Sequence, residues 1–172
     1  LISSNLERLI YLSTGCDSAK TAQLMEDLRT KGVYEVSDDM RQFMADFVAG
    51  FAEEPEVFQT IRDLKEEAGY VLDPHTAVAS SVYKQYAEKT GDTRKTVIAS
   101  TASPYKFAPN VMKALGIDVE DQDVFTVIDQ LSEISGVPEP RAIREVRNAA
   151  IRHSEVCEIS EMKKMVEDFL FV

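Results

Sequence analysis

Clustered positive charge is missing from this 172-residue sequence, in which 19 Lys and Arg stand against 30 Asp and Glu, for a formal net charge of −11. Proteins that bind the nucleic-acid backbone use grouped Lys and Arg side chains, and no part of the sequence collects enough of them. Anionic membrane surfaces attract basic segments for the same electrostatic reason. We therefore expect no nucleic acid and no membrane among the partners.

Long apolar runs and a cysteine framework are missing as well. No uninterrupted apolar stretch approaches the roughly 18–20 residues that a membrane span needs, and the N-terminus lacks the charged-then-apolar pattern of a signal peptide. The two cysteines, Cys16 and Cys157, are far apart in sequence, which favours reduced thiols over a secreted disulfide framework. We therefore expect a cytoplasmic protein.

What is present has the composition of a folded protein, with 44% hydrophobic and 28% charged residues. Apolar residues recur at helical spacing through most of the chain, and capping residues or glycines mark most helix ends. Helices are predicted over 5–12, 18–31, 38–50, 55–68, 74–90, 110–115 and 124–135. A last helix carries the apolar stripe Met162, Met165, Val166, Phe169 and Leu170, through which we expect it to dock.

One segment, 96–101 (Thr-Val-Ile-Ala-Ser-Thr), is predicted to be a buried parallel strand. Such a strand needs neighbours on both sides to satisfy its backbone, and the rest of the sequence does not supply them. The chain also begins at Leu1 instead of Met, within what already looks like a structured segment. We therefore predict an α/β fold class, helix-rich and with few strands in the chain itself, as the C-terminal part of a larger protein.

Two segments carry residues suited to a small-ligand site. His75 follows Asp73-Pro74 at a predicted helix start, where backbone N–H groups favour anions, although the sequence alone favours a capped helix with an exposed histidine. Ser100, Thr101 and Ser103 follow the predicted strand, where ligands bind in open α/β sheets; a loop that satisfies its own backbone is the alternative. A pocket between 73–76 and 100–106 is the resulting hypothesis.

Other chemical motifs are weaker or absent. His153 and Cys157 lie at i and i+4, but two ligands without a third or fourth are too few for zinc, so we interpret them as structural and predict no metal. The sequence contains no dinucleotide fingerprint, no Walker loop and no Gly-x-Ser-x-Gly elbow.

Three ordered stretches resemble the C-terminal third of bacterial and fungal threonine synthases. These are 3–9 (Ser-Ser-Asn-Leu-Glu-Arg-Leu), 70–78 (Tyr-Val-Leu-Asp-Pro-His-Thr-Ala-Val) and 100–107 (Ser-Thr-Ala-Ser-Pro-Tyr-Lys-Phe). The middle motif is the most specific, and the resemblance runs nearly end to end. It implies a lyase of fold type II that uses pyridoxal 5′-phosphate to convert O-phospho-L-homoserine and water to L-threonine and phosphate, the last step of threonine biosynthesis.

The resemblance also implies roles for individual residues. Thr101 matches the hydroxyl residue that faces the pyridine nitrogen of the cofactor, with Ser100 beside it as a cofactor-binding residue. Asp73 and His75 match a loop that borders the active site, and Asn5 begins the corresponding first segment there. Lys106 either attracts the substrate phosphate as a point charge or is a solvated surface lysine.

Departures from the family pattern limit what carries over. Ser103 stands where the family usually has histidine, so a role assigned to that histidine does not transfer. The lysine that binds the cofactor covalently and the glycine-rich loop that holds its phosphate lie upstream in the family, and nothing here matches either. We therefore expect the chain alone to be inactive and its partner to be the upstream part of the same polypeptide.

Three hypotheses follow. The first is that the chain is the C-terminal region of a threonine synthase. It divides the chain near Gly69 into a helical segment, 1–69, and the C-terminal part of a cofactor-binding α/β domain, 70–172. The second is a non-catalytic acidic helical interaction module. The third is part of another fold-type-II lyase or dehydratase, which would carry other residues at 73–78.

Overall fold

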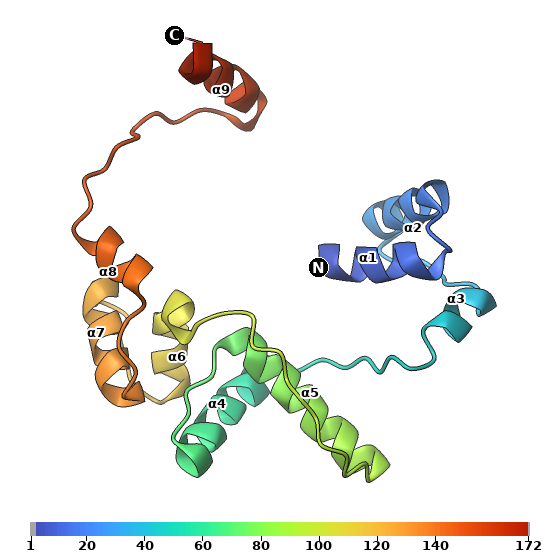
Figure 1. Cartoon of the computed structure of the whole chain (residues 1–172), viewed down its shortest axis with the longest axis horizontal. Helices are drawn as coiled ribbons and strands as arrows, with labels where there is room; N and C mark the ends of the chain where they lie inside the picture. Colours follow the sequence, from blue (N-terminus) through green and yellow to red (C-terminus); the bar gives the residue numbers. More distant parts are fainter. Residues whose placement is uncertain (1–2, 172) are drawn as a thin grey trace. The chain divides into compact units, whose positions relative to one another are not determined.

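The structure is a computed structural model that describes residues 3–171. Within these residues all regular structure is helical (Figure 1). The helices are α1 (Ser4–Ser13), α2 (Ser18–Lys31), α3 (Asp38–Phe43), α4 (Glu54–Ala68), α5 (Pro74–Thr90), η1 (Pro104–Phe107), α6 (Ala108–Ala114), α7 (Val124–Ser135), α8 (Arg141–Arg147), η2 (Ile159–Glu161) and α9 (Met162–Phe171). None of the helices in this range is both long and apolar enough to cross a membrane.

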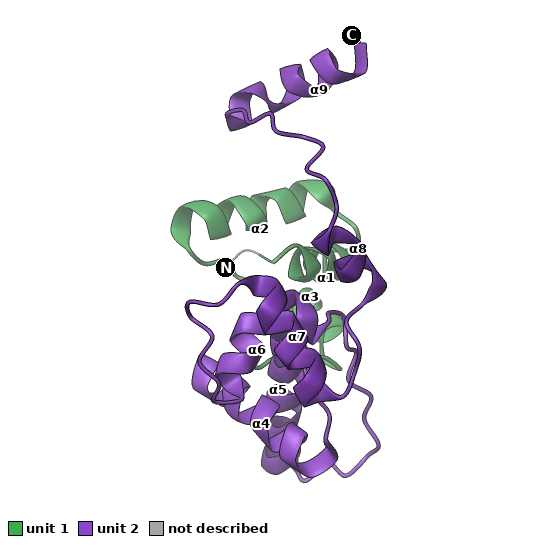
Figure 2. Cartoon of the chain, turned by 90° about the vertical axis from the view of Figure 1, so that its left-hand side faces the viewer, with its two compact units in different colours: residues 1–51 green, residues 52–172 purple. Residues whose placement is uncertain are grey.

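The chain forms two compact units, Leu1–Phe51 and Ala52–Val172 (Figure 2). In the first unit, α1 packs on α2 and α3 around the buried side chains of Ile10, Leu24 and Met40. This division differs in place from the one near Gly69, which concerns the domains of a complete enzyme and stays a prediction.

The core of the second unit is built by α4, α5, α6, η1 and α7. Helix α4 packs on α5 and α6, and α6 packs on α7. Its buried side chains are Val57, Ile61, Val71, Leu72, Ala77, Tyr105, Ala108, Val111, Met112, Ala114, Val119, Val127, Ile128 and Leu131. We call the stretch 70–78 the first motif and the stretch 100–107 the second motif. Val71 and Leu72 lie in the first motif and Tyr105 lies in the second, so both motifs are anchored in one core.

Local signals predicted most helix ends correctly. Asp17, Asp73 and Asp123 each cap a helix through side-chain oxygens. The predicted helix from 110 instead begins at Ala108, after the short η1 turn.

The predicted helix over 38–50 is too long, because α3 ends at Phe43. Only Met40 of its apolar stripe is fully buried, whereas Phe47 and Val48 are 59% and 67% exposed. Since a short helix is stabilised mainly by burying its apolar face, extension past this point gains nothing within the first unit.

The predicted strand over 96–101 is wrong for this chain. The segment has no regular structure, and Val97 is 94% exposed. A strand needs paired backbone groups, and the described residues contain no strand for it to pair with. The α/β fold class is corrected accordingly: residues 3–171 are all helical.

The docking predicted for the last helix is wrong as well. Helix α9 forms where expected, but Val166, Phe169 and Leu170 on its stripe are 56%, 71% and 64% exposed.

Candidate functional site

The start of α5 is organised around Asp73, whose side chain is buried. Its Oδ1 accepts hydrogen bonds from the backbone N–H groups of His75 at 2.9 Å and Thr76 at 3.1 Å. Its Oδ2 accepts a hydrogen bond from the Thr76 hydroxyl. Pro74 supplies the first helical residue, where its missing N–H costs nothing. The local sequence thus folds into a fully capped helix start.

A hydroxyl contact joins this helix start to the segment after α5. Thr76 Oγ1 and Ser100 Oγ lie 3.2 Å apart. At the other end of α5, the Tyr86 hydroxyl donates to Asp92 at 3.0 Å. The segment after α5 therefore runs back along the helix (Figure 1). The two motifs singled out in the sequence are neighbours in the structure.

Aromatic contacts join the same two motifs a second time. The His75 and Phe107 rings meet edge to face with their centroids 4.9 Å apart. The Lys106 ammonium lies 5.5 Å from the centroid of the same Phe107 ring. His75 and Lys106 are both exposed, so an imidazole and an ammonium group face solvent beside the linked motifs.

The hydroxyl residues of the second motif differ in what they contact. Ser100 and Thr101 are exposed. Ser103 is half-buried and accepts a hydrogen bond from the Tyr105 backbone N–H at 3.3 Å, which caps η1. Of the three hydroxyls, the two at 100 and 101 are therefore the accessible ones.

Tyr105 holds the second motif in place, a role that the sequence reasoning missed. Its side chain is buried, and its hydroxyl donates to the Val137 carbonyl and lies 3.3 Å from Ser135 Oγ. A cavity of 180 Å³ lies beside it, lined partly by Ser103, Pro104 and Pro138. An aromatic residue directly after a Ser-Pro turn is the signal that could have revealed this anchor.

The start of the segment after α5 is also held in place, by hydrogen bonds between Arg94 and Asp92 that the sequence did not reveal. Arg94 Nε donates to both oxygens of Asp92 at 2.9 Å. These bonds, with the Arg94 backbone N–H and the Tyr86 hydroxyl, hold the pKa of the Asp92 carboxyl well below its usual range. The segment is thus tied to α5 near both of its ends.

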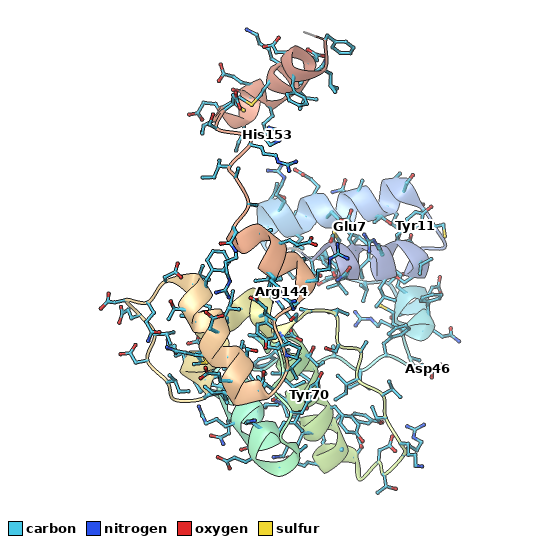
Figure 3. All side chains as sticks on the ribbon, turned by 60° about the vertical axis from the view of Figure 1, so that its left-hand side comes forward. Glu7, Tyr11, Asp46, Tyr70, Arg144 and His153 are labelled. Carbon is cyan, nitrogen blue, oxygen red and sulfur yellow. The ribbon has the colours of Figure 1, made fainter. Side chains whose placement is uncertain are left out.

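Asn5 belongs to the other compact unit. It lies exposed on α1, and its Oδ1 accepts a hydrogen bond from Arg8 Nη1 at 3.3 Å. Glu7 and Tyr11 of the same helix line a separate hollow of 460 Å³ with residues of α2 (Figure 3). The role of Asn5 at the candidate site stays a prediction.

His153 and Cys157 line an apolar groove of 690 Å³ against α9, with the His153 ring 5.9 Å from Phe169 (Figure 3). Within residues 3–171, no three His, Cys, Asp or Glu side chains gather as a metal site would require.

Comparison with known proteins identifies the family to which this chain belongs. Residues 76–157 match the family described as threonine synthase, C-terminal. The chain carries the C-terminal region of the threonine synthase family. Human threonine synthase-like 1 is 36% identical over 118 residues, which are 68% of this chain and 16% of that protein.

Solved threonine synthases agree with this assignment. A crystal structure of pyridoxal-phosphate-bound threonine synthase from Brucella melitensis matches with a TM-score of 0.56 and 32% identity, over 80% of this chain and 28% of that one. Yeast threonine synthase matches in fold with a TM-score of 0.68 and 24% identity, over 99% of this chain and 35% of that one. The all-helical fold thus corresponds to part of the threonine synthase fold, and this chain spans about a third or less of these relatives.

Proposed function

We propose that this chain works as the C-terminal portion of a pyridoxal-phosphate-dependent threonine synthase, a carbon–oxygen lyase that acts on a phosphate ester. Its reaction would convert O-phospho-L-homoserine and water to L-threonine and phosphate. The observation that carries the proposal is the direct contact between the two motifs that resemble the family most, through Thr76 and Ser100. The cofactor-bound Brucella relative supports it.

The residues present fit the ring side of the cofactor. Bound pyridoxal phosphate supplies an electron-withdrawing ring that eases removal of a proton from the substrate carbon. The exposed Thr101 hydroxyl is suited to the pyridine nitrogen, because a hydroxyl, unlike a carboxylate, does not require that nitrogen to be protonated. The ring is then a milder electron sink, which suits elimination and replacement better than transamination.

The substrate side rests on His75 and Lys106. Both side chains are exposed and lie next to Phe107, His75 from one linked motif and Lys106 from the other. The Lys106 ammonium would attract the substrate phosphate as a point charge, while Asp73 holds the backbone that presents His75. Asn5 is kept as a proposed active-site residue because of the family resemblance of its segment.

The upstream part of the polypeptide would supply the lysine that binds the cofactor covalently and the loop that holds the cofactor phosphate. In that enzyme, 1–69 would form a helical segment and 70–172 the end of the cofactor-binding domain. The 172-residue chain alone should bind pyridoxal phosphate weakly and remain inactive. Equilibrium dialysis checks this; tight stoichiometric binding with the absorbance of a lysine-bound cofactor would contradict it.

Substitution of Thr101 in the complete polypeptide tests the assignment. Thr101→Ala should lower kcat/KM about five- to tenfold, the worth of one hydrogen bond, and Thr101→Asp should add a transamination side reaction. The control is Thr96→Ala, because the Thr96 hydroxyl contacts only the Arg94 carbonyl in the same segment. A Thr101→Asp variant with full rate and no new side reaction would count against the proposal.

A second candidate is another fold-type-II lyase that releases phosphate from the same class of substrate without forming threonine. The observation that favours it is Ser103, which stands where the family usually has histidine and is engaged in capping η1. Quantifying threonine and phosphate together separates the two candidates, because only threonine synthase forms them in equal amounts.

A further inference from the structure

Three side chains form a hydrogen-bonded chain that leads from the core to the surface of the second motif. Asp73 is 1% exposed and Thr76 is 4% exposed, whereas Ser100 is exposed. The Asp73 carboxylate contacts the Thr76 hydroxyl, whose oxygen lies 3.2 Å from that of Ser100.

Counting protons fixes the direction of this chain. An ionised carboxylate only accepts, and a hydroxyl has one proton to give. The Thr76 hydroxyl is the donor in both contacts, to the Asp73 carboxylate and to Ser100 Oγ, so its single proton is shared between the two acceptors. The Ser100 oxygen is therefore the acceptor at the end of the chain, and this contact holds its side chain toward Thr76.

Thr101 differs from its neighbour in this respect. Among the described residues, no hydrogen bond engages the Thr101 hydroxyl, so its proton remains free. Of the two adjacent exposed hydroxyls, Ser100 is held by a contact within the chain, and Thr101 is the one that is free to turn toward an unprotonated nitrogen.

We propose that Asp73 is a positioning residue that acts through Thr76 to fix the Ser100 side chain, and with it the path of the backbone into Thr101. Asp73 would touch neither cofactor nor substrate. The link to cofactor binding rests on the proposed function, but the fixed Ser100 rotamer is a property of the chain itself. Ser100 holds the 97–102 stretch to α5 at the residue before the proposed donor.

Nuclear magnetic resonance of the 172-residue chain without cofactor tests the proposal. In the unchanged chain, the Thr76 hydroxyl proton should exchange slowly, and the Ser100 side-chain couplings should report one rotamer. Thr76→Ser should keep both properties, because it keeps the hydroxyl. Thr76→Val should abolish the hydroxyl signal, average the Ser100 couplings and lower the order of the Thr101 and Ala102 amides.

Two further variants keep the test decisive if Thr76→Val does not fold. Ser100→Ala removes only the exposed end, so the Thr76 hydroxyl signal should persist while order at Thr101 falls. Thr60→Val on α4 is the matched control, since the Thr60 hydroxyl bonds only the Glu56 carbonyl of its own helix. Averaged Ser100 couplings in the unchanged chain, or order at Thr101 that neither Thr76→Val nor Ser100→Ala alters, would overturn the proposal without bearing on the lyase activity.

Discussion

Arg147 contacts three side chains of the C-terminal part. Its guanidinium donates to both oxygens of Asp129 at 2.8 and 2.6 Å and to Glu139 at 2.8 Å, and it lies 5.1 Å from the Phe125 ring centroid. These contacts tie α8 to α7 and to the connection between them. Two parallel bonds to one carboxylate give such a pair a defined geometry that pairs with a single bond lack.

Arg147→Met should therefore lower the urea midpoint of unfolding of the second unit clearly more than Arg141→Met. The control residue lies on the same helix and makes only the exposed i, i+4 pair with Glu145, a type of pair that contributes about 0.5 kcal/mol or less. Equal midpoints for the two variants would show that the Arg147 contacts do not hold α8.

The same contact predicts a pH dependence. Hydrogen bonds from Arg147 hold the pKa of the Asp129 carboxyl below its usual range, against a smaller opposing effect of desolvation. A lowered folded-state pKa contributes stability above the unfolded pKa of about 3.9, and that stability is lost as pH falls through the folded-state value. The difference in urea midpoint between wild type and Arg147→Met should thus be full at neutral pH and shrink on acidification below about pH 4. A difference that stays constant down to pH 2 would contradict this assignment.

At this scale the sequence revealed the local part of the site. Asp73 is identifiable as a cap because its bonds go to residues two and three positions away. The Thr76–Ser100 contact spans 24 residues and depends on how the segment folds back on α5, which no local pattern encodes. The contacts among Tyr86, Asp92 and Arg94 span only two to six residues, but no motif marks them, so they were missed as well.

Among the elements, α4 stabilises its neighbours by capping them. Arg62 Nη1 donates to the Ala114 carbonyl at 2.6 Å, at the end of α6, and Lys65 Nζ donates to the Ile134 carbonyl at 2.7 Å, in the last turn of α7. Carbonyls at helix ends lack intrahelical partners and carry the negative end of the helix dipole. Two cations one turn apart on α4 thus satisfy two different helices.

Lys65→Met should lower the free energy of unfolding of the second unit by roughly 1–2 kcal/mol through loss of this cap. Lys84→Met, at an exposed position on α5, should change it by less than about 0.5 kcal/mol. Urea unfolding followed by circular dichroism measures both. Equal effects at the two positions would mean that the Ile134 contact contributes nothing specific.

Element prediction succeeded where the cause was local and failed where it was not. The capped ends of α2, α5 and α7 follow from aspartates that bond nearby N–H groups. The strand at 96–101 failed because β-prone residues require partner strands, which residues 3–171 do not contain. The final helix formed, but its stripe found no surface to cover it, so amphipathic spacing predicted the helix and not its packing.

For the whole molecule, the exposed 96–101 segment gives a prediction about the complete polypeptide. If upstream residues supply a parallel sheet, the backbone amides of 96–101 should be hydrogen-bonded there and unprotected in the 172-residue chain. Hydrogen exchange of the two proteins measures the difference. The α4 amides, which are helical in this chain, serve as the internal control and should be protected in both. Equal exchange at 96–101 in both proteins would contradict a strand role.

The measurement that tests the account most directly is product formation from O-phospho-L-homoserine by the complete polypeptide with pyridoxal phosphate, with and without Thr101→Ala. The account predicts threonine and phosphate in equal amounts, and a rate that falls about five- to tenfold in the variant. Phosphate without threonine, or threonine formation that the Thr101 substitution leaves unchanged, would contradict the role assigned to the stretches 70–78 and 100–107.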